Sequence, residues 1–223
     1  MVSNCRILEI PQLSEAWFAA RCGLVTGSKA SAVLATGKGK AEAAPRRDLR
    51  TQLVTERLTG LPQGDAIYVT DDMRRGRELE PAARSAYEIQ TGNMVRQTGL
   101  VVHSDLPIAC SLDGDVDDLA GIVEIKCPRP AIHIGYVQCG TVPKKHVPQI
   151  VHNLLVTGAQ WADFVSYAPS LPDHLQTFVV RLVAVDIARE LAAYELALRM
   201  FLKEVDAEYT ALQSRSVSFA EFE

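Results

Sequence analysis

Long apolar runs and an export signal are both missing from this sequence of 223 residues. A membrane-spanning helix needs about 18 or more consecutive apolar residues, and no stretch of the chain approaches that length. The N-terminal residues MVSNCRILEIPQ lack the apolar segment and the small-residue cleavage site of a signal peptide. These absences predict a cytoplasmic protein that has no membrane partner.

Cysteine is scarce, and its spacing argues against the common metal-binding frameworks. The five cysteines are Cys5, Cys22, Cys110, Cys127 and Cys139. Their number is odd and no two form a C-x-x-C pair, which disfavours a zinc knuckle or a local four-cysteine cluster. We therefore expect reduced thiols, as is usual in the cytoplasm.

An excess of positive charge is also absent from the composition as a whole, since the net charge is −4. The distribution is uneven, however. Residues 21–77 hold eleven Lys and Arg against six Asp and Glu, whereas residues 78–124 hold nine acids against two bases. This segregation suits a protein that grips phosphates with one region and concentrates divalent cations with the next, although two solvated faces would produce it equally well.

Hydrophobic periodicity and turn signals predict mostly helices early in the chain and strands later. The expected helices cover residues 14–21, 28–35, 46–59, 70–91, 131–138, 144–156 and 186–212, and the expected strands cover 94–103, 107–112, 121–127, 162–167 and 177–185. Ser14 and Thr70 are expected to cap their helices. Pro81 is expected to kink the long helix or to begin a new segment, because proline lacks the backbone donor.

This order of elements predicts an α/β fold of three layers, in which a mixed sheet is flanked by helices. A length of 223 residues with 48% hydrophobic composition favours one core. We expect a single domain over residues 1–223, with a helical N-terminal portion at about 12–92 and a C-terminal helix at about 186–212.

The segment SLDGDVDDLAGIVEIKCP, residues 111–128, is the most informative for chemistry. Asp113 ends one expected strand, and Glu124 and Lys126 lie on the next. Because strand side chains alternate between faces, Glu124 and Lys126 point the same way and Ile125 points into the core. A hairpin would bring Asp113 back beside them, so that two carboxylates and an ammonium converge.

These side chains are of the types that phosphodiester hydrolysis needs. Carboxylates suit Mg²⁺, which usually takes only one or two of them and leaves positions for water and phosphate. The metal polarises the phosphate and lowers the pKa of a water, and a lysine beside it can orient that water or offset developing charge. The backbone carbonyl of Ile125 is a further expected oxygen ligand. The alternative is an exposed hairpin with a surface salt bridge between Glu124 and Lys126.

Several ordered motifs make most of the chain similar to a known family. They are W-x3-R-x-G-x-x-T-x-S at 17–28, G-x-x-x-E-x-x-A-R at 76–84, S-x-D-G at 111–114, E-I-K-C-P at 124–128, and Gln149 ahead of a V-T-G helix end at 156–158. Over about residues 17–167 the sequence resembles the phage lambda exonuclease branch of the PD-(D/E)xK nuclease superfamily, with the viral alkaline exonucleases and YqaJ-type viral recombinases. The resemblance implies a restriction-endonuclease-like core.

The resemblance also implies roles for individual residues. Asp113 and Glu124 would bind metal, Lys126 would be the catalytic lysine, and Glu80 would be a further acid at the metals. Gln149 would belong to an additional catalytic motif on the helix behind the site. The cofactor would be Mg²⁺, with two ions per site and Mn²⁺ as a substitute. Without the family, Glu80 is a solvated helix carboxylate and Gln149 a surface residue.

A pocket for a 5′-terminal phosphate is implied in the same way, with Arg21, Thr26, Ser28 and Ser111 as its binding residues. Arginine offers a two-pronged donor, hydroxyls add further donors, and the start of a helix presents free N–H groups. The alternative for Thr26 and Ser28 is simple N-capping, and one residue could do both.

Two more residues match positions that contact DNA in the family. Met73 aligns with an apolar residue that helps to separate the terminal base pairs, and a core methionine is the alternative. Lys38 lies where the family has a basic residue on a mobile loop that reaches toward DNA. Leu112 replaces the proline of the family motif, and we expect little effect because only the aspartate binds metal.

The resemblance implies a 5′-to-3′ exonuclease that digests one strand of linear double-stranded DNA to mononucleotides and leaves a 3′ overhang. It further implies a homotrimer, a phage or prophage recombination role, and a single-strand annealing protein as partner. Two alternatives remain. A single-strand-specific nuclease or endonuclease on the same fold conflicts with a terminal-phosphate pocket, and a catalytically inactive DNA-binding module conflicts with the intact Asp113, Glu124 and Lys126.

Overall fold

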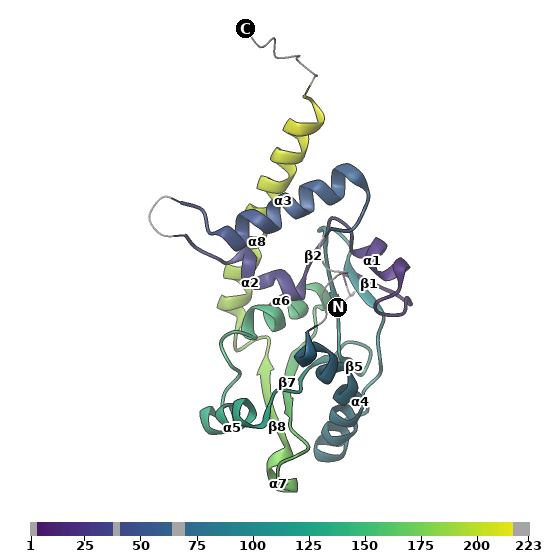
Figure 1. The fold of residues 1–223 in the computed structure, drawn as a ribbon, viewed down its shortest axis with the longest axis vertical. Coiled ribbons are helices and arrows are strands. Elements are labelled where there is room, and N and C mark those ends of the chain that lie inside the picture. Colours follow the sequence, from purple (N-terminus) through teal and green to yellow (C-terminus); the bar gives the residue numbers. More distant parts are fainter. Residues whose placement is uncertain (1–3, 38–40, 64–69, 216–223) are drawn as a thin grey trace.

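The structure is a computed structural model that describes residues 4–37, 41–63 and 70–215. Its strands are β1 (Cys5–Leu8), β2 (Val25–Thr26), β3 (Leu100–His103), β4 (Ile108–Ser111), β5 (Gly114–Val116), β6 (Gly121–Lys126), β7 (Trp161–Tyr167) and β8 (Thr177–Val183). Its helices are α1 (Glu15–Arg21), the 3-10 turn η1 (Gly27–Lys29), α2 (Ala30–Val33), α3 (Ala44–Thr59), α4 (Asp71–Thr91), α5 (Pro130–Cys139), α6 (Val147–Thr157), α7 (Asp173–Gln176) and α8 (Ala188–Gln213). Figure 1 shows that α3 crosses α8 near one end of the molecule, whereas α4 and α5 lie toward the other.

The described strands form two mixed sheets of four strands each, in the orders β1-β3-β4-β2 and β5-β6-β7-β8. β2 pairs parallel with β4, β6 pairs parallel with β7, and the other neighbours are antiparallel. The chain leaves the first sheet at Ser111 and enters the second at Gly114, so only Leu112 and Asp113 join the two. The predicted α/β class, with helices around mixed β-structure, is confirmed. The prediction of one sheet is wrong, because the described strands form two.

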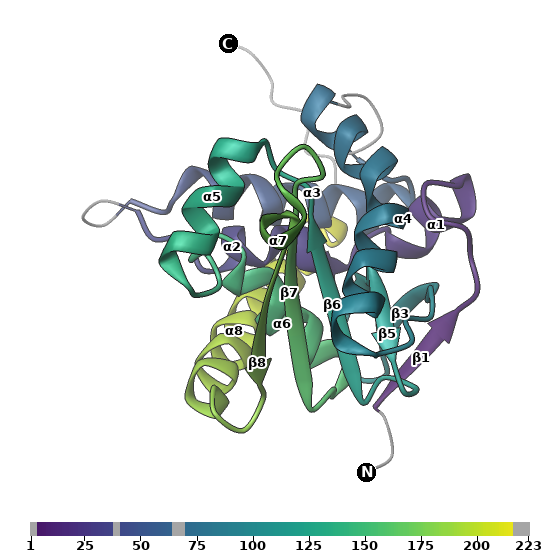
Figure 2. The same cartoon turned by 90° about the horizontal axis from the view of Figure 1, so that it is seen from below.

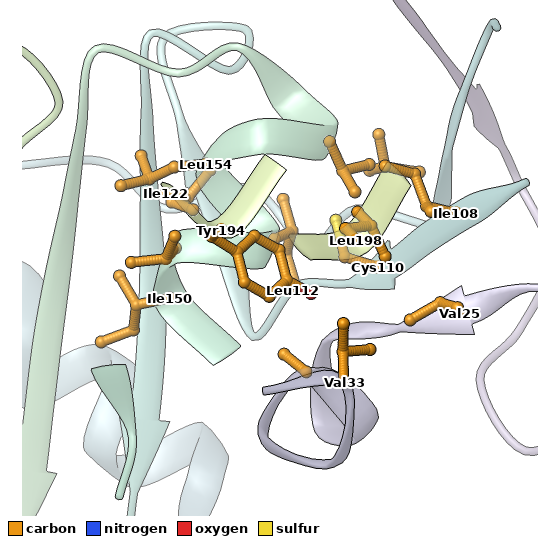
Figure 3. Packing of buried hydrophobic residues seen from close by; sticks show 14 of the residues in the cluster. Val25, Val33, Ile108, Cys110, Leu112, Ile122, Ile150, Leu154, Tyr194 and Leu198 are labelled. Carbon is orange, nitrogen blue, oxygen red and sulfur yellow. The ribbon is translucent and has the colours of Figure 1, made fainter. Parts of the chain in front are cut away.

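α6 packs across both sheets, since it contacts β3 and β4 of the first and β6 and β7 of the second. Its apolar residues Ile150, Val151 and Leu154 recur at helical spacing and are all buried. They join Ile122 of β6 and Leu198 of α8 in the main hydrophobic core, which draws on both sheets (Figure 3). One helix therefore fixes the two sheets relative to each other, at the link that carries Asp113.

α4 covers the opposite face of the second sheet. Its buried residues Ala83 and Tyr87 pack with Val123 and Ile125 of β6. Figure 2 shows β6, β7 and β8 side by side, with α4 on one side and α5 and α8 on the other. Because side chains alternate along β6, Glu124 faces away from α4 and toward α6. The predicted inward orientation of Ile125 is confirmed.

The strand expected over residues 94–103 is shorter than predicted. β3 begins only at Leu100, where it pairs with Leu8 of β1. Before that point the only pairing in the described residues is an isolated antiparallel bridge between Arg96 and Asp115. No strand continues from it. Residues 94–99 have the apolar pattern of a strand, but they lack a neighbouring strand with which to form a continuous ladder.

The long helix α4 begins as predicted, at a Thr70 hydroxyl that accepts a hydrogen bond from the Met73 N–H. It then continues through Pro81 as one helix, so of the two expected effects of the proline the start of a new segment is wrong. The burial of Ala83 and Tyr87 beyond the proline offsets the one lost helix hydrogen bond. Within the described part of the chain no helix is long and apolar enough to cross a bilayer.

His152 on α6 makes the stability of the core depend on pH. Its ring is buried between β4 and α8, where one nitrogen lies 3.0 Å from the carbonyl oxygen of Ala109 and the other 2.8 Å from the hydroxyl of Tyr194. A carbonyl can only accept, so Nε2 carries the proton and Nδ1 accepts from Tyr194. Burial lowers the pKa of His152 to about 4, which keeps the ring neutral.

His152→Gln is expected to reduce the acid sensitivity of the fold. The unfolded chain takes up this proton near pH 6.5 and the folded chain only near pH 4, so stability is lost as the pH falls between these values. Between pH 7.5 and pH 5 this loss amounts to about 2 kcal/mol. Glutamine keeps a donor but does not titrate, so urea unfolding should show a smaller pH difference by that amount. His174→Gln, at an exposed position, is the control, and an unchanged pH difference in His152→Gln would contradict the argument.

Candidate active site

The β5–β6 hairpin brings Asp113 beside the middle of β6. Gly114 pairs with Val123 in antiparallel register, so Asp113, one residue earlier, lies next to Glu124. Asp113 Oδ2 accepts a hydrogen bond from the backbone N–H of Ile125 at 2.6 Å, which holds this carboxylate against the strand. The structure therefore brings together the two acids that the sequence places on different strands.

Lys126 joins this pair from the same face of β6. Its Nζ forms an ion pair with Glu124 Oε1, and Asn153 Nδ2 of α6 donates to Glu124 Oε2 at 3.2 Å. Glu124 is only 1% exposed. An exposed hairpin with a surface salt bridge, the alternative interpretation of this pattern, is therefore wrong.

α4 adds an acid and an arginine on the other side of Asp113. Arg84 donates to Glu80 Oε1 at 2.7 Å, one helical turn away, and to the carbonyl oxygen of Asp113 at 3.1 Å. Arg84 thereby ties α4 to the link between the two sheets. Glu80 and Asp113 line the same hollows in the surface, which places the third predicted acid beside the other two.

Burial is the main cause that raises the pKa of all three carboxyl groups. Burial raises the pKa of Glu124 to about 7, a shift that Lys126 reduces and Asp113 increases. Burial also raises the pKa of Asp113 against the effect of Lys126, and burial and the Asp113 charge raise that of Glu80. Burial alone would lower the pKa of Lys126, but Glu124 and Asp113 raise it above its ordinary value. Three carboxyl groups thus share the site with two cationic side chains, Lys126 and Arg84.

These residues fit a hard divalent cation. All candidate donors are oxygens, and a cation among the carboxylates would offset their negative charge. In the described residues no three Asp, Glu, His or Cys side chains form a group that could hold a metal ion by themselves. Because Mg²⁺ usually takes one or two protein carboxylates and keeps several waters, a set of Asp113, Glu124 and the Ile125 carbonyl matches its preference.

A second group of predicted residues lines a hollow that opens onto Asp113. The hollow is formed by α1, the turn from β2 into η1, the end of β4 and one side of α6. Its lining includes Arg21, Thr26, Ser28, Ser111, Asp113, Gln149 and Asn153. All four residues predicted for a phosphate pocket thus share one space with the predicted metal ligand Asp113.

Trp17 organises this hollow. The Arg21 guanidinium lies 3.8 Å from the centre of the Trp17 ring, and the Trp17 Nε1–H donates to Ser111 Oγ at 3.0 Å. Arg21 also donates to Thr26 Oγ1 at 3.2 Å. A guanidinium fork beside two hydroxyls is a donor set that matches the oxygens of a phosphate.

Capping does not explain the two hydroxyl residues of the turn. Thr26 precedes η1 but makes no side-chain cap hydrogen bond. Ser28 lies inside η1, and the N-cap of α2 is Lys29. The helix expected over residues 28–35 is instead η1 followed by the single turn of α2, so the capping alternative is wrong for both residues.

The remaining predicted residues lie around the same opening, with one exception. Gln149 lines the hollow directly rather than standing behind it. Met73 is 48% exposed and lines an adjoining hollow together with Arg21, Arg77 and Glu80, so the alternative of a core methionine is wrong. Lys38 lies outside the described residues.

A further hollow opens on the other side of the acids, toward α5 and the start of α6. Tyr136, Lys145 and His146 line it together with Asp113 and Lys126. Burial, Lys126 and Lys145 lower the pKa of His146 to about 4, so its ring is neutral at pH 7. The acids thus stand between two openings, one lined by the Arg21 cluster and one by basic and aromatic side chains.

Sequence reasoning gave no role to Arg84 and missed Asn153 and the Tyr136–His146 side of the site. Arg84 had a usable signal, since an arginine four residues after Glu80 can pair with it along a helix. Asn153 lies one turn after Gln149 on the same face of α6, but an uncharged amide in an apolar helix carries no pattern of its own.

Comparisons with known proteins agree with this geometry. The model of the YqaJ-like viral recombinase domain matches residues 16–160. Two solved structures of an alkaline exonuclease from Laribacter hongkongensis, the second in complex with dAMP, are 38% and 37% identical to this chain, with TM-scores of 0.77 and 0.78. Each match covers 90% of this chain and 96% of that one.

A phage related exonuclease from Haemophilus somnus 129PT is 12% identical, with a TM-score of 0.57 over 83% of this chain and 96% of that one, which is a likeness of fold alone. A comparison with curated proteins gave no match. The residues matched by the family model, 16–160, include Arg21, Asp113, Glu124 and Lys126.

Proposed function

The chain belongs to the YqaJ-like viral recombinase family, and from this premise we propose that it is a magnesium-dependent 5′-to-3′ exonuclease. It digests one strand of linear double-stranded DNA to mononucleotides and leaves a 3′ overhang. The observation that carries this proposal is the single hollow in which Arg21, Thr26 and Ser111 meet Asp113. A terminal phosphate held by the first group leaves the adjoining phosphodiester close to the acids.

Mg²⁺, for which Mn²⁺ would substitute, would be held by Asp113, Glu124 and the carbonyl of Ile125, with Glu80 at hand for a second ion. When bound, the metal would polarise the phosphate and make a water more acidic. The oxygen donors and the presence of three acids beside only two cationic side chains support this assignment.

Three side chains, those of Lys126, Gln149 and Met73, contribute to the reaction and to the binding of DNA. The Lys126 ammonium, held in place by Glu124, donates to the attacking water or to phosphate oxygens that gain charge in the transition state. Gln149, on the wall of the hollow, offers an amide to the same oxygens. Met73, exposed at the rim, packs against a terminal base and helps to separate the end of the duplex.

The family supports a wider setting for the reaction. We propose that the protein acts in phage-type recombination in the bacterial cytoplasm, as a homotrimer around its DNA. The 3′ overhang that it leaves is a substrate for a single-strand annealing protein, which is the proposed partner.

A direct assay separates this function from its rivals. With Mg²⁺, linear duplex DNA carrying a labelled 5′ phosphate should release labelled mononucleotide first, and EDTA should abolish the release. Closed circular DNA should remain intact, because it offers no end. Cleavage of circular DNA would instead indicate an endonuclease, and preference for single strands would indicate a single-strand-specific enzyme. The absence of any metal-dependent product from neutral to alkaline pH would indicate an inactive binding module.

A further inference from the structure

Asn153 connects the proposed metal ligand to the proposed phosphate pocket. It is 1% exposed and lies on α6, one turn after Gln149. Its Nδ2 donates to Glu124 Oε2 at 3.2 Å, while Lys126 holds the other oxygen of the same carboxylate. Both oxygens of Glu124 are thus fixed from different elements, β6 and α6.

The other side of the Asn153 amide faces Gly27 in the turn between Thr26 and Ser28. The Glu124 carboxylate that pairs with Lys126 is ionised and only accepts, so the amide nitrogen faces it and Oδ1 faces away. Oδ1 is buried and has no hydrogen-bond partner among the described residues. A Cβ added at Gly27 would lie 2.4 Å from this oxygen, a separation that real Cβ contacts do not reach.

A buried carbonyl oxygen without a partner is unfavourable and is rare in folded proteins. The Asn153 amide keeps this orientation because its nitrogen donates to the buried Glu124 carboxylate. A charged group gains more from a hydrogen bond than a neutral one. The turn accommodates that orientation only because position 27 has no side chain. The backbone does not require glycine at this position, because Gly27 does not have a positive φ.

We propose that Asn153 is a positioning residue for Glu124, and that Gly27 is required because Asn153 occupies the space of its missing Cβ. The inference rests on the proposed function, in which Glu124 binds the metal. It identifies the route by which the phosphate-binding turn and the metal ligand are held in one geometry.

A double-mutant cycle tests this coupling. Asn153→Ala removes the donor, and Gly27→Ala displaces the amide from Glu124 by steric conflict. Each single change is expected to weaken Mn²⁺ binding, measured by isothermal titration calorimetry, by roughly 10-fold or more, the usual effect of losing an outer-shell partner of a metal ligand. In the double variant with Asn153→Ala, Gly27→Ala should cause little further loss of Mn²⁺ affinity, because the oxygen with which its Cβ collides is gone.

Three controls keep the result interpretable. Gly135→Ala, in a helix where a Cβ meets open space, should leave Mn²⁺ affinity unchanged. Asn153→Leu, of similar size, should lose as much affinity as Asn153→Ala while it preserves packing. Circular dichroism and the melting temperature report the fold of each variant, and nuclease assays report the accompanying fall in rate.

Two outcomes would overturn the inference while leaving the proposed function intact. One is that the Asn153 variants bind Mn²⁺ with wild-type affinity. The other is that the losses of Mn²⁺ binding free energy in Gly27→Ala and Asn153→Ala add up in the double variant. A wild-type protein that binds no Mn²⁺ and cleaves no DNA would overturn both proposals together.

Discussion

Asp113→Asn is expected to slow the release of mononucleotides from linear duplex DNA by roughly 10³-fold or more, with no loss of fold. Asparagine keeps an oxygen that can accept the Ile125 N–H, which Asp113 Oδ2 accepts at 2.6 Å. The change removes the negative charge and replaces the second carboxylate oxygen with an NH2 group. If that charge holds the metal, about 4 kcal/mol of transition-state stabilisation disappears with it.

The measurement compares single-turnover rates in Mg²⁺ for the wild type and the variant. DNA affinity is measured in parallel by fluorescence anisotropy in Ca²⁺. Asp118→Asn is the matched control, because Asp118 lies on the same hairpin with a side chain that is 89% exposed. Its rate should equal that of the wild type. An Asp113→Asn protein that folds and cleaves at a tenth of the wild-type rate or faster would remove Asp113 from the metal site.

The acids at the centre of the site could be predicted because their signal is local. Glu124 and Lys126 share a strand face by alternation, and Ile125 between them faces the core. Asp113 follows from the turn that returns the chain onto that strand. None of these steps needs a contact between distant segments, so one sequence sufficed to place the three side chains together.

The division into two sheets could not be predicted, because it depends on distant pairing. β1 is a short edge strand that pairs with β3 almost a hundred residues later, as Cys5 opposite His103. β5 has only three residues, Gly114–Val116. Short segments of this kind carry little periodicity. The link of Leu112 and Asp113, where the chain changes sheets, reads in the sequence simply as the end of a strand.

The phosphate pocket was available only through the resemblance to a family. Arg21, Thr26 and Ser111 come from three separate elements, and each by itself has a mundane local interpretation. Trp17 is what joins them, through its ring beneath Arg21 and its hydrogen bond to Ser111. Asn153 was missed for a similar reason, since its two important neighbours, Glu124 and Gly27, lie far from it in the sequence.

Arg21→Ala is expected to abolish the preference for a 5′-phosphorylated end. The guanidinium beside Thr26 Oγ1 and over the Trp17 ring would donate to the terminal phosphate through charge-assisted hydrogen bonds. Their loss should cost about 2–3 kcal/mol, or roughly 30- to 150-fold in rate on 5′-phosphorylated duplex. The rate on 5′-hydroxyl duplex should change little, because that end offers no phosphate to bind.

The ratio of the two rates separates recognition from a structural role. Arg21 also covers Trp17, so its loss could disturb the fold, and such damage would slow both substrates equally. Arg21→Lys retains the charge without the two-pronged geometry, and we expect it to keep only part of the preference. Arg199→Ala, at a pair with Glu195 on the surface of α8, should leave the ratio untouched. An equal loss on both ends would place Arg21 in the scaffold, and the end-selective enzyme would then need another phosphate site.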